Sequence, residues 1–113
     1  MISKMRMFKI RRSLKLSLLA PLALALWSSG ASHAADMIKG GNLYATHCAA
    51  CHGVSGVSMM PGAPSFARGE GLLQADLALL VAIKSGKNVM PAFQGVLSDR
   101  DILDVIAYLR TLN

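Results

Sequence analysis

The residues best suited to chemistry form one short string, Cys48-Ala49-Ala50-Cys51-His52, which holds both cysteines of the chain. The spacing C-x-x-C-H is the pattern by which two thiols attach a c-type haem. On a helix, positions i, i+3 and i+4 lie on one face. Cys48, Cys51 and His52 can therefore meet one flat group together, the thiols bonding its edge and the imidazole its iron. The string predicts one covalently attached haem c with His52 as an iron ligand.

The residues leave three other uses of the cysteine pair open. A disulfide is the default in an oxidising compartment, but here it would close a very short loop and stabilise little. A thioredoxin-like redox pair needs a strand before a helix, and no strongly alternating β-run occurs. A zinc site would need His47 and His52 beside both cysteines, all four from six consecutive residues, which is poor geometry. We expect His47 to face away from the haem, because it lies about 100° around a helix from Cys48.

The first 34 residues have the features of an export signal. Six of the twelve Lys and Arg lie in the first fifteen residues, and a twelve-residue apolar run, Leu16–Trp27, follows. A spanning helix needs about 20 apolar residues, so this run fits the middle region of a secretory signal instead. Ser32-His33-Ala34 offers small residues at the two positions that signal peptidase reads. We predict a cleaved signal peptide over residues 1–34, a mature domain over 35–113, location in a bacterial periplasm and no stable membrane insertion.

The composition of the mature part excludes one class of partner and calls for a cofactor. From residue 36 onward six Lys and Arg face six Asp and Glu, so the net charge is zero. Without a basic excess there is no electrostatic footprint for nucleic acid. The 79 mature residues contain only four aromatic side chains, Tyr44, Phe66, Phe93 and Tyr108. A domain of this size has a marginal core, so a large bound group such as haem is expected to complete it.

Three helices are expected to position the C-x-x-C-H string. The first runs from Met37 to about Ala50 and ends in the string, and residues 53–70 form a loop rich in Gly, Pro and Ser. The second, Ala75 to Ser85, ends before Gly86, and the third starts at a capping box formed by Ser98 and Asp101. Apolar residues stand at helical spacing in both later helices: Leu77, Leu80 and Val81, then Ile102, Val105, Ile106 and Leu109.

With these elements in place, the chain resembles the class I c-type cytochromes over essentially all of residues 35–113. Four motifs occur in that family's order: Gly40 and Tyr44 before Cys48, the loop 62–66, the loop 88–93 and the terminal segment 104–109. The resemblance implies the all-α cytochrome c fold, in which three main helices and irregular loops wrap around one covalently bound haem.

The resemblance also implies roles for two residues outside the string. Pro64, twelve residues after His52, looks like the family's proline whose carbonyl accepts a hydrogen bond from the proximal histidine and orients it. Met90, followed by Pro91, is similar to the methionine that serves as the distal iron ligand. Met59 and Met60 are rivals for that position.

His/Met ligation occupies both axial positions of the iron and raises its reduction potential. Such a closed centre suits one-electron transfer and needs no general acid or base. The resemblance therefore implies an electron-transfer protein rather than an enzyme, passing electrons between a donor and an acceptor of a respiratory chain, such as an oxidase, a reductase or a dehydrogenase. With no net charge, we expect docking to rest mainly on apolar surface. Three alternatives remain: a dedicated haem subunit of a larger complex, a small haem enzyme, and a gas-binding haem sensor, the last two with an open sixth position.

Overall fold

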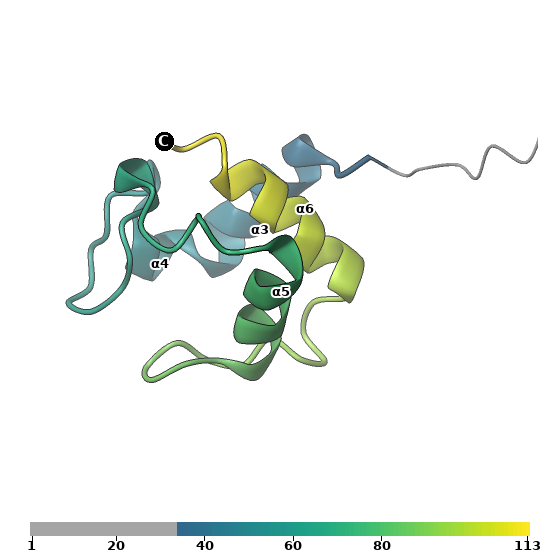
Figure 1. Cartoon of the computed structure of the whole chain (residues 1–113). Helices are drawn as coiled ribbons and strands as arrows, with labels where there is room; N and C mark the ends of the chain where they lie inside the picture. The colour runs from purple at the N-terminus through teal and green to yellow at the C-terminus, as the bar shows by residue number, and fades with distance from the viewer. Residues whose placement is uncertain (1–33) are drawn as a thin grey trace, which may run out of the picture. The chain divides into compact units, whose positions relative to one another are not determined.

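Three helices of ten or eleven residues form the frame of the described structure: α3 (Met37–His47), α5 (Asp76–Ser85) and α6 (Asp99–Leu109) (Figure 1). A short helix α4 (Ala49–His52) and a 3-10 turn η2 (Phe66–Arg68) lie between the first two. The computed structural model describes residues 34–113, so the predicted signal peptide lies almost entirely outside the described residues. Within residues 34–113 the only β features are two isolated bridges, and the prediction of three main helices is confirmed.

Local sequence explains where helices α3 and α6 begin. The Asp36 carboxylate accepts hydrogen bonds from the amides of Ile38 and Lys39 and thus caps α3. Ser98 and Asp101 form the predicted capping box of α6: the amide of Asp101 donates to Ser98 Oγ at 3.1 Å, and the amide of Ser98 donates to the Asp101 carboxylate at 3.0 Å. No helix within the described part of the chain is long and apolar enough to cross a bilayer.

Helices α3 and α6 cross in close contact, and a glycine permits that contact (Figure 1). A Cβ atom on Gly40 would lie 2.0 Å from the backbone oxygen of Asp104, which no side chain can accommodate. Beside the crossing, the ring of Tyr44 lies 5.4 Å from that of Tyr108, centroid to centroid, and 6.3 Å from that of Phe66. The pairing of Gly40 with the terminal helix thus fixes how the first helix, and the string at its end, is placed.

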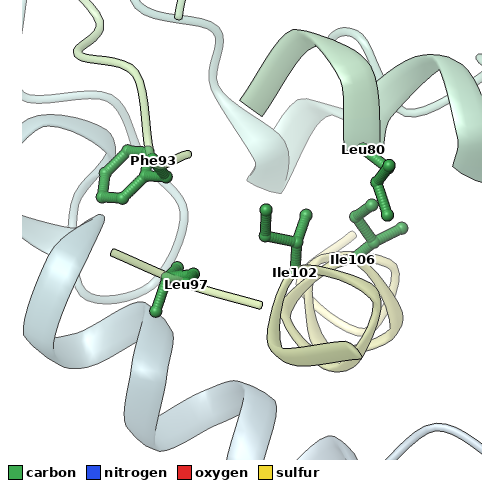
Figure 2. Packing of buried hydrophobic residues seen from close by; sticks show 5 residues of the cluster. All are labelled: Leu80, Phe93, Leu97, Ile102 and Ile106. Carbon is green, nitrogen blue, oxygen red and sulfur yellow. The ribbon is translucent and has the colours of Figure 1, made fainter. Parts of the chain in front are cut away.

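A cluster of buried apolar side chains joins α5 and α6 to the loop between them (Figure 2). Its members are Leu80, Phe93, Leu97, Ile102 and Ile106. All four apolar residues predicted to form the buried face of α6 are buried. In α5 only Leu80 of the three spaced residues is buried, whereas Leu77 and Val81 are 71% and 53% exposed. Helix α5 turns Leu79 and Ile83 toward the cluster instead, because the loop carrying Phe93 packs on that side.

A buried carboxylate ties the start of α3 to α6. Asp104 is 1% exposed and accepts a hydrogen bond of 2.9 Å from the amide of Asp36. Its oxygens also lie 3.7 Å from Lys39 Nζ and 3.3 Å from Arg100 Nε. A buried charge is tolerated only when it is paired in this way, so Asp104 acts as an electrostatic anchor between the first and last helices.

We expect Asp104→Asn to lower the free energy of unfolding by about 2–3 kcal/mol, because the amide loses the charge that pairs with Lys39 and Arg100. Chemical denaturation of the haem-loaded protein measures the effect. The matched control is Asp99→Asn in the same helix, whose carboxylate pairs with Lys84 at the surface and is expected to matter by less than about 0.5 kcal/mol. Equal losses in both variants would contradict the anchor role.

Candidate haem-binding site

One cavity of about 440 Å³ gathers the residues that the sequence singled out. Helices α3, α4, α5 and α6 and the loops between them all contribute to its wall. The lining residues are His47, Cys48, Cys51, His52, Met60, Gly62, Ala63, Pro64, Phe66, Gly71, Gln74, Leu79, Ala82, Ile83, Lys87, Asn88, Val89, Met90, Pro91, Phe93, Val105 and Leu109. The volume falls in the range of cofactor sites, and the wall is mostly apolar with a few polar groups, as such sites are.

The two cysteines lie on one helical turn at the cavity wall. Helix α3 ends at His47, and Cys48 caps the short helix α4, so the expected single helix is broken at the first cysteine. The amides of Cys51 and His52 donate to the carbonyl of Cys48 at 3.2 and 3.0 Å, which keeps the i, i+3, i+4 arrangement. The break therefore leaves the predicted common face intact.

The state of the cysteines disfavours two of the alternatives. Both thiols are free, and burial is the main factor that raises the pKa of Cys48 to about 11. A redox-active cysteine pair works through the thiolate, which burial of Cys48 disfavours. No group of three or more His, Cys, Asp or Glu within residues 34–113 is arranged to hold a metal ion. Neither a redox-active pair nor a zinc site is supported.

His52 is held from two sides and presents one nitrogen for binding. It is 8% exposed, its Nδ1 lies 3.1 Å from the carbonyl oxygen of Pro64, and its ring stacks on Phe66 with centroids 4.5 Å apart. A carbonyl only accepts, so Nδ1 is the donor in this hydrogen bond, and Nε2 is the ring nitrogen that remains to bind a metal. The predicted contact between His52 and Pro64 is present, and it gives the imidazole the tautomer that a metal ligand needs.

The turn after His52 is fixed by two features that sequence reasoning missed. The buried hydroxyl of Tyr44 donates to the carbonyl of Gly53 at 2.6 Å, and burial raises the pKa of Tyr44 to about 12. Gly53 has φ of 81°, and a Cβ there would lie 1.9 Å from the carbonyl oxygen of Val57. The stacking of Phe66 on His52 was also not foreseen. The signal available for Tyr44 was its spacing of four from Cys48, one helical turn.

Met90 enters the same cavity from a tight loop after α5. Its amide and carbonyl bond to the carbonyl and amide of Lys87 at 3.0 and 3.1 Å, and its side chain packs against the Phe93 cluster. The two other candidates for the distal ligand, Met59 and Met60, differ in position. Met60 also lines the cavity and is 38% exposed, whereas Met59 is 73% exposed and is not part of the wall. The geometry therefore offers two methionines to a ligand in the cavity, of which Met90 is the one packed into the core.

One expectation about the wall is wrong. His47 does not face away from the site but belongs to the cavity lining, with its ring edge-on to Phe93 at 6.1 Å between centroids. The chain leaves helical geometry at Cys48, where φ is −119°, so the 100° rotation expected from a continuous helix does not apply. His47 remains exposed to solvent and lies at the rim.

The residues present fit a c-type haem. The cavity combines two free thiols, an imidazole oriented through Nδ1, a methionine and a largely apolar wall. These are the donor set and the surroundings by which proteins hold haem iron and its macrocycle. A wall of this size without a bound group would expose much of the apolar interior of a small domain, so a macrocycle seated here would complete the core.

The whole described domain matches a known class of haem proteins. A family model described as "Cytochrome C oxidase, cbb3-type, subunit III" matches residues 35–109. Cytochrome c6 of Synechococcus sp. (strain ATCC 27167 / PCC 6312) is 37% identical over 102 residues, which cover 82% of this chain and 89% of that protein. Cytochrome c6 of Thermosynechococcus vestitus is 37% identical over 92 residues, covering 78% and 80% of the two chains.

Structural comparison agrees. The crystal structure of cytochrome c6 from the diatom Phaeodactylum tricornutum matches with a TM-score of 0.55 at 31% identity, over 67% of this chain and 92% of that chain. The chain belongs to the cytochrome c family, as a small class I c-type cytochrome. It is a monohaem electron carrier and not an enzyme, which confirms the predicted class, the all-α cytochrome c fold and the single covalent haem c.

Proposed function

We propose that this cytochrome c carries single electrons between redox proteins of a respiratory chain in a bacterial periplasm, with His52 and Met90 as the two axial ligands of its iron. A bound haem c supplies a one-electron couple between ferric and ferrous iron. The observation that carries the ligand assignment is the common cavity, in which His52 and Met90 come from elements 38 positions apart in the sequence.

Each site residue has a separate task in this proposal. Cys48 and Cys51 form thioethers with the haem edge. His52 binds the iron through Nε2, and the carbonyl of Pro64 holds the imidazole in orientation. Met90 would hold the iron as its second protein ligand, so that oxygen or peroxide could not bind without displacing this side chain. With both ligands held by the folded chain, the site would suit one-electron transfer with little rearrangement.

A dedicated haem subunit of an oxidase is the second candidate. The family model that matches the chain bears the description of an oxidase subunit, and this favours the alternative of a chain that works inside a larger complex. Relatives described as cytochrome c6 favour an independent carrier. Oxidases, reductases and dehydrogenases are all candidate partners. Co-purification of the exported protein in stoichiometric amounts with an oxidase would favour the subunit role.

Maturation of the precursor is also part of the proposal. Cleavage between Ala34 and Ala35 would release residues 35–113 as the cytochrome c domain. The contacts that hold the start of α3 lie just after this point, since Asp36 bonds to the buried Asp104 and caps α3. A cut before Asp36 therefore leaves every described contact of α3 in place.

The test is export of the full chain in a bacterium with haem-attachment machinery. Mass spectrometry is expected to find the chain that starts at Ala35 plus one haem, and the haem is expected to remain with the polypeptide after denaturation. The matched control replaces both thiols, Cys48→Ala with Cys51→Ala, and is expected to release its haem on denaturation. Carbon monoxide is expected to bind the reduced wild type only weakly. Rapid, tight binding would contradict the closed iron, and a wild type without attached haem would overturn the assignment of the site.

A further inference from the structure

The cationic side chains of the described domain are almost all in ion pairs, and the exception lies at the cavity. Five of the six Lys and Arg in residues 34–113 form ion pairs with carboxylates: Lys39, Arg68, Lys84, Arg100 and Arg110. None of these five lines the haem cavity. Lys87 has no carboxylate partner among the described residues, and it is part of the cavity wall.

The position of Lys87 is fixed although its side chain is exposed. Its backbone is bonded to Met90 in both directions, at 3.1 and 3.0 Å. Gly86 precedes it with φ of 74°, in a turn so close that a Cβ there would lie 2.7 Å from the carbonyl oxygen of Met90. The backbone that carries Lys87 is thus hydrogen-bonded to the methionine that lines the same cavity.

No other wall residue is a Lys or an Arg, so Lys87 is the one side chain of the wall with a permanent positive charge. No Asp or Glu lines the cavity, and apart from the predicted haem-binding residues the only other titratable side chain is His47 at the rim. A haem carries two propionate carboxylates on its periphery. Placing them in a largely apolar cavity without a counter-charge would be costly, because a carboxylate near low-dielectric surroundings needs a partner.

From this arrangement we propose that Lys87 is the counter-ion of a haem propionate and thereby raises the reduction potential of the iron. The inference rests on the haem site proposed above. A positive charge that offsets a propionate lowers the electrostatic cost of adding an electron to the iron, so the ferrous state is favoured. Because Lys87 is exposed, solvent and salt screen the effect and keep it moderate.

The experiment compares Lys87→Gln with Lys84→Gln in the haem-loaded protein. Both variants remove one positive charge, but Lys84 pairs with Asp99 at 2.6 Å and does not line the cavity. In equilibrium redox titrations without any partner protein, Lys87→Gln is expected to shift the reduction equilibrium two- to threefold toward the ferric state. That is a potential lower by ~18–28 mV at 59 mV per tenfold change. Lys84→Gln is expected to shift it by less than half as much, and Lys87→Arg is expected to restore the wild-type value.

Further readouts separate this role from its rivals. The far-red sulfur-to-iron band and the free energy of unfolding are expected to be unchanged in Lys87→Gln, and the difference in potential is expected to shrink as salt is added. Equal shifts in the two Gln variants would overturn the proposal. The proposal would also be overturned if Lys87→Gln kept the wild-type reduction potential but changed the salt dependence of electron exchange with a partner protein. That result would make Lys87 a docking contact. A wild type without haem would overturn the haem site as well, whereas a haem-loaded protein with equal shifts overturns the role of Lys87 alone.

Discussion

Met90→Leu is expected to abolish the weak far-red sulfur-to-iron band of the oxidised protein and to lower its reduction potential by on the order of 0.2 V, part of the ≈ 0.8 V that axial ligands span. Leucine has nearly the volume of methionine, so the contacts with the Phe93 cluster are largely kept while the sulfur is lost. The visible spectrum and a redox titration of the same sample measure both effects. An iron without its sulfur ligand is also expected to bind carbon monoxide tightly once reduced.

The rival methionines provide the controls for this prediction. Met60→Leu replaces the other methionine of the cavity wall, and Met59→Leu replaces a side chain that is 73% exposed and outside the wall. Both are expected to keep the band and the potential. If the band survives Met90→Leu and disappears in Met60→Leu, then Met60 is the ligand and Met90 is part of the core. Survival of the band in all three variants would rule out all three as the ligand.

Gly40→Ala is expected to lower the free energy of unfolding by about 3 kcal/mol, even though alanine is the better helix former by roughly 0.5–1 kcal/mol. The reason is that the added Cβ would lie 2.0 Å from the oxygen and 2.5 Å from the carbon of the Asp104 carbonyl, both backbone atoms of α6. The helices must then move apart, which disturbs the packing of Tyr44 and the position of the C-x-x-C-H string. Denaturation followed by circular dichroism measures the loss.

The neighbouring glycine is the matched control. A Cβ on Gly41 would meet only the ring of Tyr108, at 3.1 Å, and a side chain can shift by a few tenths of an ångström. Gly41→Ala is therefore expected to change the free energy of unfolding by less than about 1 kcal/mol. A Gly40→Ala protein as stable as Gly41→Ala would show that the two helix backbones do not touch at this point.

Much of the fold could be predicted because its signals are local. The capping box of Ser98 and Asp101 and the spacing of Ile102 and Ile106 lie within a few residues of one another, and the structure contains both. The exposed faces of α5 show the limit of such reasoning. Leu77, Leu80 and Val81 all stand at helical spacing, but only Leu80 is buried. Helical spacing of apolar residues predicts a helix with an apolar face, and it does not predict which part of that face a neighbouring segment covers.

The candidate site divides in the same way. The amino-acid string alone predicts a covalent haem at Cys48 and Cys51 and an iron ligand at His52, since attachment depends on a spacing of residues within one helical turn. The role of Pro64 and Met90 came from likeness to a family, and the structure brings both into one cavity with His52. Pro64 and Met90 stand 12 and 38 positions after His52, and the longer of the two segments includes helix α5. Their distances from His52 therefore depend on how these segments return to the first helix, which no local pattern determines.

By itself, the sequence determined the haem-attachment string and most of the helix positions, because each rests on residues that are neighbours along the chain, and the order of four motifs indicated the class of protein. Only the tertiary structure decided which groups line the cavity. It placed His47 at the rim, stacked Phe66 on His52, and left Lys87 as the unpaired cation of the cavity wall. Packing, solvent exposure and ion pairing are set by the meeting of distant segments. For this reason the haem attachment and the role of His52 are predicted by one short string, whereas the side chains around the cavity depend on the crossing of helices and the closing of loops.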